Sequence, residues 1–312
     1  MPTFEDRLKV LLVKIEAGGY GVDPVPTAGA NAVLAKNVSF KAAEGRDVSR
    51  DLDRPFMGAQ QQFPTGQHST LTFETELVGH AAPGTAPGWG AIARAAGLAQ
   101  VLSAGVSVTY TPISTAFESA TFYFYFEGKF FRMRGARGTG VFKLNADQLP
   151  VIAWSFMGLY DAPTDLAIVA PTLTSFNEPQ VVNKANTPTF TINGVALKMR
   201  SFELDMGVQT AFRELVNYEE VRIGDRAERI RTQVDGEALA TLDPYTLSKN
   251  QTAFQTQIVH GVGAGKIVTL TMPTCRMQRP DAPTAPDGIV EWPLSITPLP
   301  NTGNDQFSLV LT

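Results

Sequence analysis

Residues 71–77 alternate between apolar and polar side chains. Leu71, Phe73 and Leu77 fall on one side of this alternation, and Glu74 and Glu76 fall on the other. A period of two is typical of a β-strand with one face in a core and one face against water. The segment therefore predicts a strand that buries Phe73 and turns its carboxylates away from the core.

Several other segments predict strands. The expected strands cover residues 33–42, 106–112, 120–126, 189–192 and 195–205. Asn193-Gly194 separates the last two, and this pair is a strong hairpin signal. The aromatic run 122–126 leaves neither face polar, so we expect a core on one side of it and a neighbouring subunit on the other.

Three segments predict short helices. Leu8, Leu11, Leu12 and Ile15 follow the i, i+3, i+4, i+7 spacing of one helix face. Residues 88–99 and 246–260 also place apolar side chains at helical spacing. The chain is thus expected to be mainly β with a few short helices.

The chain contains what reads as an internal repeat. A Gly-Lys turn and a later Trp recur as Lys129 with Trp154 and as Lys266 with Trp292, 25 and 26 residues apart. Upstream, the segment around Phe73 matches the segment around Val234, which makes Phe73, Trp154, Val234 and Trp292 the expected repeat core. We predict a first domain at 1–160, a Pro-rich linker at 161–187 and a second domain at 188–312. A loose alignment of two β-rich halves is the alternative.

Composition agrees with two β-rich domains. The chain has 312 residues with 27 Gly and 21 Pro, enough for two cores joined by many turns. A net charge of −4 argues against a protein that grips nucleic acid by its phosphates. Cys275 is the single cysteine, and no run is long and apolar enough to span a bilayer. We expect a soluble protein made in a reducing cytoplasm.

The sequence offers no catalytic constellation. Its three histidines have no metal-ligand spacing, so no metal, cofactor or catalytic residue is expected. Residues 261–266 resemble a phosphate loop but lack the Ser or Thr after the Lys, and a hairpin turn is expected instead. The Gly-rich residues 135–140 predict a flexible turn. The nearby Arg132, Arg134 and Arg137 either meet acidic groups of a neighbour or form a solvated face.

Several segments together resemble the tail tube (major tail) proteins of phages with long, non-contractile tails. The segments that carry the resemblance are 11–16, 20–27, 30–33, 50–56, 135–138, 158–165, 201–207 and 303–307. The likeness covers nearly the whole chain as an overall pattern. It implies a β-sandwich with a flanking short helix in each domain, and strands that close into a ring-shaped β-barrel on oligomerisation.

The resemblance also implies function and partners. Two such domains per chain would give a homotrimeric ring with pseudo-six-fold symmetry, stacked into a tube in the virion tail and assembled in the host cytoplasm. Its partners would be the tape measure protein, the tail terminator and distal tail or baseplate proteins, with genomic DNA passing through unbound and no membrane contact. A capsid-decoration or baseplate protein is the structural alternative. A two-domain carbohydrate-binding module or hydrolase is a third reading, and it lacks a catalytic pair.

Two surfaces are expected to serve assembly. The loop 54–67 carries apolar residues among polar ones, and we expect Arg54, Phe56, Met57 and Phe63 to contact the next ring. Four carboxylates are expected to face the lumen of the ring, twelve in three chains, and these are Glu74, Glu76, Asp235 and Glu237. A negative lumen would repel DNA phosphates; a solvated outer face is the alternative position for these acids.

Overall fold

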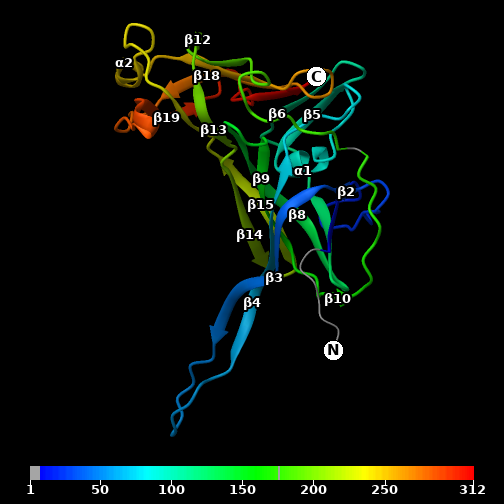
Figure 1. The fold of residues 1–312 in the computed structure, drawn as a ribbon. Helices are drawn as coiled ribbons and strands as arrows, with labels where there is room; N and C mark the ends of the chain where they lie inside the picture. Colours follow the sequence, from blue (N-terminus) through cyan, green and yellow to red (C-terminus); the bar gives the residue numbers. More distant parts are fainter. Residues whose placement is uncertain (1–7, 175) are drawn as a thin grey trace.

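The computed structural model describes residues 8–174 and 176–312, and within them the chain is mainly β (Figure 1). The first seven residues of the expected first domain and Ser175 of the expected linker lie outside this description. The elements of the first half are β1 (Lys9–Ile15), β2 (Ala32–Val33), β3 (Ala35–Ser49), β4 (Gln62–Glu76), α1 (Gly90–Ala95), β5 (Leu98–Ser103), β6 (Ser107–Pro112), β7 (Ala120–Phe126), β8 (Lys129–Asn145), β9 (Val151–Leu159) and β10 (Thr164–Asp165).

The second half repeats much of this order. Its elements are β11 (Thr189–Ile192), β12 (Val195–Ala196), β13 (Met199–Asp205), β14 (Val208–Leu215), β15 (Tyr218–Arg226), β16 (Arg229–Asp235), α2 (Pro244–Asn250), β17 (Phe254–His260), β18 (Val268–Met277), the 3-10 turn η1 (Pro286–Gly288), β19 (Glu291–Pro298) and β20 (Ser308–Leu311). The mainly β class expected from the sequence is confirmed, and of the three predicted helices 88–99 contains α1 and 246–260 overlaps α2.

Four strands in each half pair in the same order. In the first half β4 pairs with β3 and β9, and β9 pairs with β8. In the second half β16 pairs with β13 and β19, and β19 pairs with β18. The registers also agree, because Phe73 lies opposite Trp154 and Val234 lies opposite Trp292. All four of these side chains are buried.

The strand β8 joins the two sets of strands. It pairs with β7 at its start, with β9 through its middle, and through Val141–Asn145 with Ser201–Asp205 of β13. The buried side chains of both halves form one continuous cluster rather than two separate cores. A second contact, β20 with β6, also links the halves.

The Gly-rich residues 135–140 form the middle of β8, so the prediction of a flexible turn was wrong. A Cβ on Gly140 would lie 2.6 Å from the Trp154 ring, and one on Gly138 would lie 2.7 Å from the Phe156 ring. These glycines are therefore needed because aromatic rings of β9 lie flat over the strand.

The segment 8–15 was predicted to be helical, and this prediction was also wrong. Residues Lys9–Ile15 form β1, which pairs with β2 and along its whole length with β7. Leu11 and Val13 belong to the main core, whereas Val10 and Leu12 pack with Tyr123 in a second cluster. A short apolar run buried on both faces fits a helix pattern by chance, because most of its positions are apolar.

The predicted helix 246–260 is a helix only in its first part. Asp243 caps α2 by accepting hydrogen bonds from the backbone N–H groups of Tyr245 and Thr246, and Gln251 ends it in a left-handed conformation. Residues 254–260 then form the strand β17, with Phe254, Thr256 and Ile258 turned inward.

The expected linker 161–187 runs along the side of the body, as the green segment of Figure 1 shows. It pairs with β8 through β10, and its Val169 and Leu173 pack beside Tyr123 and Tyr125 of β7. The aromatic strand β7 is therefore covered on its outer side by this chain's own linker. The expectation that a neighbouring subunit provides that cover was wrong.

The end of the linker is held by a buried histidine. His260, which is 2% exposed, has its Nδ1 2.9 Å from the Thr187 hydroxyl and its Nε2 3.1 Å from the carbonyl oxygen of Gln180. A neutral ring satisfies both contacts, with the Thr187 hydroxyl donating to Nδ1 and the Nε2–H donating to Gln180. Burial lowers the pKa of His260, and the backbone hydrogen bond from Gln180 opposes that shift.

We predict that acid loosens this end of the linker. Because the folded pKa of His260 lies below the unfolded value of about 6.5, the neutral ring contributes its full stability above that pH. The contribution is lost as the pH falls toward the folded pKa, at up to about 1.4 kcal/mol per pH unit. Denaturant unfolding between pH 7 and pH 5 should show a steeper loss of stability for the wild type than for His260→Gln. An equal loss of unfolding free energy in the two proteins would refute the role assigned to the neutral His260 ring.

Candidate assembly surface

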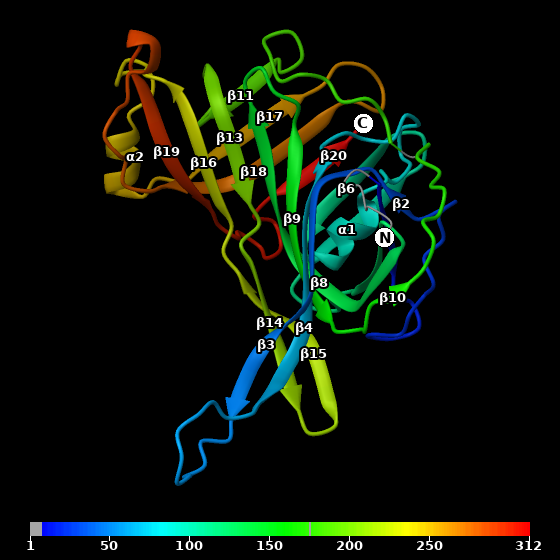
Figure 2. The ribbon, with the colours of Figure 1, turned by 60° about the horizontal axis from the view of Figure 1, so that its bottom comes forward.

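A long β-hairpin projects from the body of the protein. The strands β3 and β4 extend together as far as Ser49 and Gln62, and residues 50–61 form the tip (Figures 1 and 2). We call residues 46–66 the first arm. At its tip Phe56 is 66% exposed and Met57 is fully exposed, and the Arg54 guanidinium lies 6.0 Å from the Phe56 ring. Phe63, on the stem, is 46% exposed. Large apolar side chains grouped at a projecting tip are typical of a contact surface.

A second hairpin, formed by β14 and β15, extends from the body on the same side (Figure 2). We call residues 208–226 the second arm. Its tip carries Leu215, Val216 and Tyr218, of which Val216 is 94% exposed. These residues were not predicted from the sequence. The part of the sequence that could have indicated this tip is Leu215-Val216-Asn217, in which two apolar residues precede an Asn that adopts a positive φ.

The second arm is anchored to the body by Arg137. Its guanidinium donates to the Glu220 carboxylate at 2.7 Å and to the carbonyl oxygen of Val221 at 2.8 Å, both on β15. It also stacks over the Tyr20 ring at 4.9 Å. The Tyr20 hydroxyl accepts from the Val221 N–H at 2.6 Å and donates to Gly135, and burial raises its pKa. This buried ion pair fixes the direction in which the second arm leaves the body.

The two arms touch near their bases. The His68 ring on β4 stacks on the Phe212 ring of β14, with centroids 5.2 Å apart. His68 is thus packed and bonded locally, through Nδ1 and the carbonyl oxygen of Gly66. The first arm extends beyond this contact, so its tip is free of the body.

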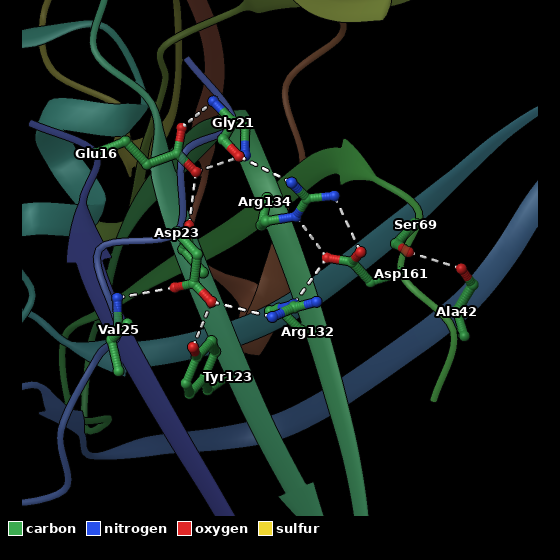
Figure 3. Close-up of polar contacts among 12 residues, drawn as sticks. Glu16, Gly21, Asp23, Val25, Ala42, Ser69, Tyr123, Arg132, Arg134 and Asp161 are labelled. Carbon is green, nitrogen blue, oxygen red and sulfur yellow. Dashed lines mark hydrogen bonds and ion pairs between the residues drawn. The ribbon is translucent and has the colours of Figure 1, made fainter. Parts of the chain in front are cut away.

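Arg132 and Arg134 bind acids of their own chain (Figure 3). Both donate to Asp161, at the start of the linker, at 2.9 and 2.7 Å. Arg132 also donates to Asp23 at 3.2 Å, and Asp23 accepts from the Tyr123 hydroxyl as well. The two hypotheses for this cluster, acids of a neighbour and a solvated face, are replaced by an internal network that fixes the linker.

A buried carboxylate supports the same region. Glu16, which is 8% exposed, accepts hydrogen bonds from the Gly21 and Gly135 N–H groups, each at 2.7 Å, and from the hydroxyls of Ser119 and Thr121. Four donors satisfy its oxygens without a counter-ion. The residues that follow β1 are thereby tied to β7 and β8.

Three of the four carboxylates that were expected to line a lumen lie on the sheet face opposite the core. Glu74 and Glu76 alternate with the buried Phe73 and Leu77, as predicted, and Asp235 ends β16 beside the buried Val234. Glu237 lies beyond the end of β16, so it is outside the strand pairing. The assignment of this face to a lumen stays a prediction.

This polar face is not uniformly negative. Directly paired strand residues share a face, and one such row runs through Glu76, Val151, Lys143, Glu203 and Arg231.

The next row runs through Lys36, Glu74, Ala153, Val141, Asp205 and Arg229. Acids and bases are thus mixed across β3, β4, β8, β13 and β16, and the two rows hold four of each. These two rows therefore do not form the negative surface that was expected.

The described residues form no catalytic or metal site. Within 8–174 and 176–312, no three His, Cys, Asp or Glu side chains come together as metal ligands. Cys275 is buried, and burial raises the pKa of its thiol to about 11, which keeps it protonated and unreactive. The residues 261–266, examined as a phosphate loop, form the turn between β17 and β18. Across the described helices, none is long and apolar enough to cross a membrane.

An interlocked β body, two arms with apolar tips and a charge-balanced sheet face define a structural protein built for self-association. The chain belongs to the phage tail tube protein family, whose model matches residues 7–302. This is a family of structural proteins and not of enzymes, and it places the protein in the phage tail. No curated protein matches the chain.

Proposed function

We propose that the protein polymerises as stacked rings of three chains into a tail tube through which the genome passes. The observation that carries this proposal is the junction between β8 and β13. It joins two sets of four strands that have the same order, β3-β4-β9-β8 and β13-β16-β19-β18. The same junction can be repeated between chains.

The two ends of the combined sheet fit such a repetition. Among the described residues, β3 pairs with β4 alone, so its other edge is unpaired. At Arg276–Met277, β18 has β19 as its strand partner and no described strand on its other side, and the Gln251 side-chain amide donates to the Met277 carbonyl oxygen. These edges occupy the places of β13 and β8 in the internal junction. Pairing β3 of one chain with β18 of the next would satisfy both edges and close the sheet into a barrel. Each chain has two of these four-strand sets, so three chains supply the six sets of one ring.

The polar sheet face suits the wall of a conduit for DNA. In the closed barrel the core-facing side lies outward, against α1, α2 and the remaining strands, and the polar face lines the channel. A phosphate approaching Lys143 or Arg229 meets Glu203 or Asp205 in the neighbouring position. The neighbouring acids reduce phosphate binding, which otherwise strengthens with each unpaired base.

The arms suit contacts between rings. Both extend from the same side of the body (Figure 2), and their apolar tips require cover that the chain itself does not provide. The tube would end against a tail terminator and against distal tail or baseplate proteins, and it would enclose a tape measure protein during assembly. The tube would be assembled in the host cytoplasm, and the family supports its final place in the virion tail.

The first test is the number of chains per ring. We expect a cryo-electron microscopy reconstruction of rods of the purified protein to show three chains per ring with pseudo-six-fold symmetry and the linker 161–187 on the outer wall. Six chains per ring, or the two halves of one chain in different rings, would contradict the duplicated-domain interpretation.

The second test removes the apolar tip. Phe56→Asp should abolish rods in negative stain, because a carboxylate cannot be buried without a partner. Its free energy of unfolding should stay within about 0.5 kcal/mol of the wild type, because the site is exposed. Gln61→Asp adds the same charge to the same tip at an exposed polar position and is the matched control. Normal rods from Phe56→Asp would exclude the first arm as a ring contact.

The third test changes the charge of the polar face. Replacing Glu74, Glu76, Asp235 and Glu237 by Lys leaves the neighbouring bases without their acids. We expect intact tubes, and DNA release from virions that is slower on the order of tenfold and recovers in high salt. Gln and Asn at the same positions are the control for lost carboxylates without added bases. Unchanged release from the Lys variant would place these residues outside the channel.

A further inference from the structure

An apolar cavity of about 560 Å³ opens where the linker meets the second half. Val182, Phe190 and Leu197 form its buried base, and Ala146, Ala196 and Met199 line its sides. Its volume lies within the range of roughly 300–1,000 Å³ that is typical of pockets that enclose a ligand. Two or three large apolar side chains are the kind of group that it can take.

The cavity lies at the end of the body opposite the first arm. It is lined by Ala196 of β12 and by Met199 at the start of β13, and Figure 1 shows β12 at the top of the view and the tip of β3–β4 at the bottom. A contact between opposite ends of identical chains is heterologous, so it repeats in one direction without closing. Such a contact produces a filament, which is what stacked rings require.

We propose that this cavity receives the tip of the first arm, residues Phe56 and Met57, from a chain in the neighbouring ring. The inference rests on the proposed function, because it names the receptor for the contact between rings. The exposed apolar side chains at the tip would fill the cavity, and the cavity would cover these side chains from water.

The charges around the two surfaces are complementary. Asp147, Lys184 and Lys198 line the cavity at exposed positions. The tip carries both signs beside its apolar residues, in Arg50, Asp51, Asp53 and Arg54. Each kind of charge on the tip therefore has a counter-charge at the cavity, which favours one register over others.

A second cavity is a poorer receptor for this tip. It measures about 660 Å³ and lies at the base of the second arm, between Phe117, Ile223 and Leu299. Its lining includes the charged Arg222, Asp225, Arg226 and Glu228. Arg226 is already held there by Glu228 and by Asn304, so an entering apolar tip would separate bound charges.

The test is a disulfide between rings. A chain with Met57→Cys and Ala196→Cys changes two exposed positions, and the native Cys275 is fully buried. Rods are first assembled under reducing conditions and counted by electron microscopy. Oxidation should then give a ladder of covalent multimers on a non-reducing gel, with most chains cross-linked.

Two further cysteine pairs test whether the cross-link is specific to the first arm and the cavity. Met57→Cys with Ala104→Cys uses an exposed position on the β5–β6 turn that lies outside the cavity, and it should give no ladder. Val216→Cys with Ala196→Cys tests the second arm as a rival occupant, and it should also give none. A ladder in either pair, or rods without a ladder in the first pair, would overturn the proposed receptor while leaving the tube proposal intact. Absence of rods from the wild-type chain would overturn both.

Discussion

The fold depends on one strand, β8, that makes three successive pairings. Its start holds β7, its middle holds β9, and Val141–Asn145 hold β13 of the second half. Glycine is required along it, because Trp154 and Phe156 occupy the space that side chains on Gly140 and Gly138 would fill. A break in β8 would therefore remove the β8–β13 pairing between the two halves and open the core they share.

The same strand also directs the surfaces that serve assembly. Arg137 on β8 binds Glu220 of the second arm, while Arg132 and Arg134 on β8 bind Asp161 of the linker. Among these pairs Arg137 with Glu220 is the most buried, and loss of one partner costs more the further a pair is removed from water. The chain thus uses ion pairs to fix the positions of its arm and linker, and it leaves apolar tips for contacts with other chains.

Much of the fold could be predicted wherever one face of a strand is buried. Residues 71–77 alternate in the sequence and in the structure, and Asn193-Gly194 forms the turn between β11 and β12 with both residues at positive φ. The repeat matched Phe73 with Val234 and Trp154 with Trp292, and the strand register then brings the equivalent residues of each half opposite each other. The exposed tip at Phe56 and Met57 could also be found, because two large apolar residues in a polar loop have no local partner.

The sequence by itself determined the β class, the alternating strands, the repeated order of elements and the apolar tip of the first arm, because these depend on residues close together in the chain. Tertiary structure decided the rest. Residues 9–15 became a strand because β2 and β7 lie on either side of them, and local pattern cannot distinguish a fully buried strand from a helix. Only the folded chain brings the arginines of β8 into contact with Asp23, Asp161 and Glu220. In the same way, the polar face is charge-balanced because β8, β13 and β16 lie side by side. Pairings between residues far apart in sequence leave no periodic signal, because each depends on the register of strands that the whole fold sets.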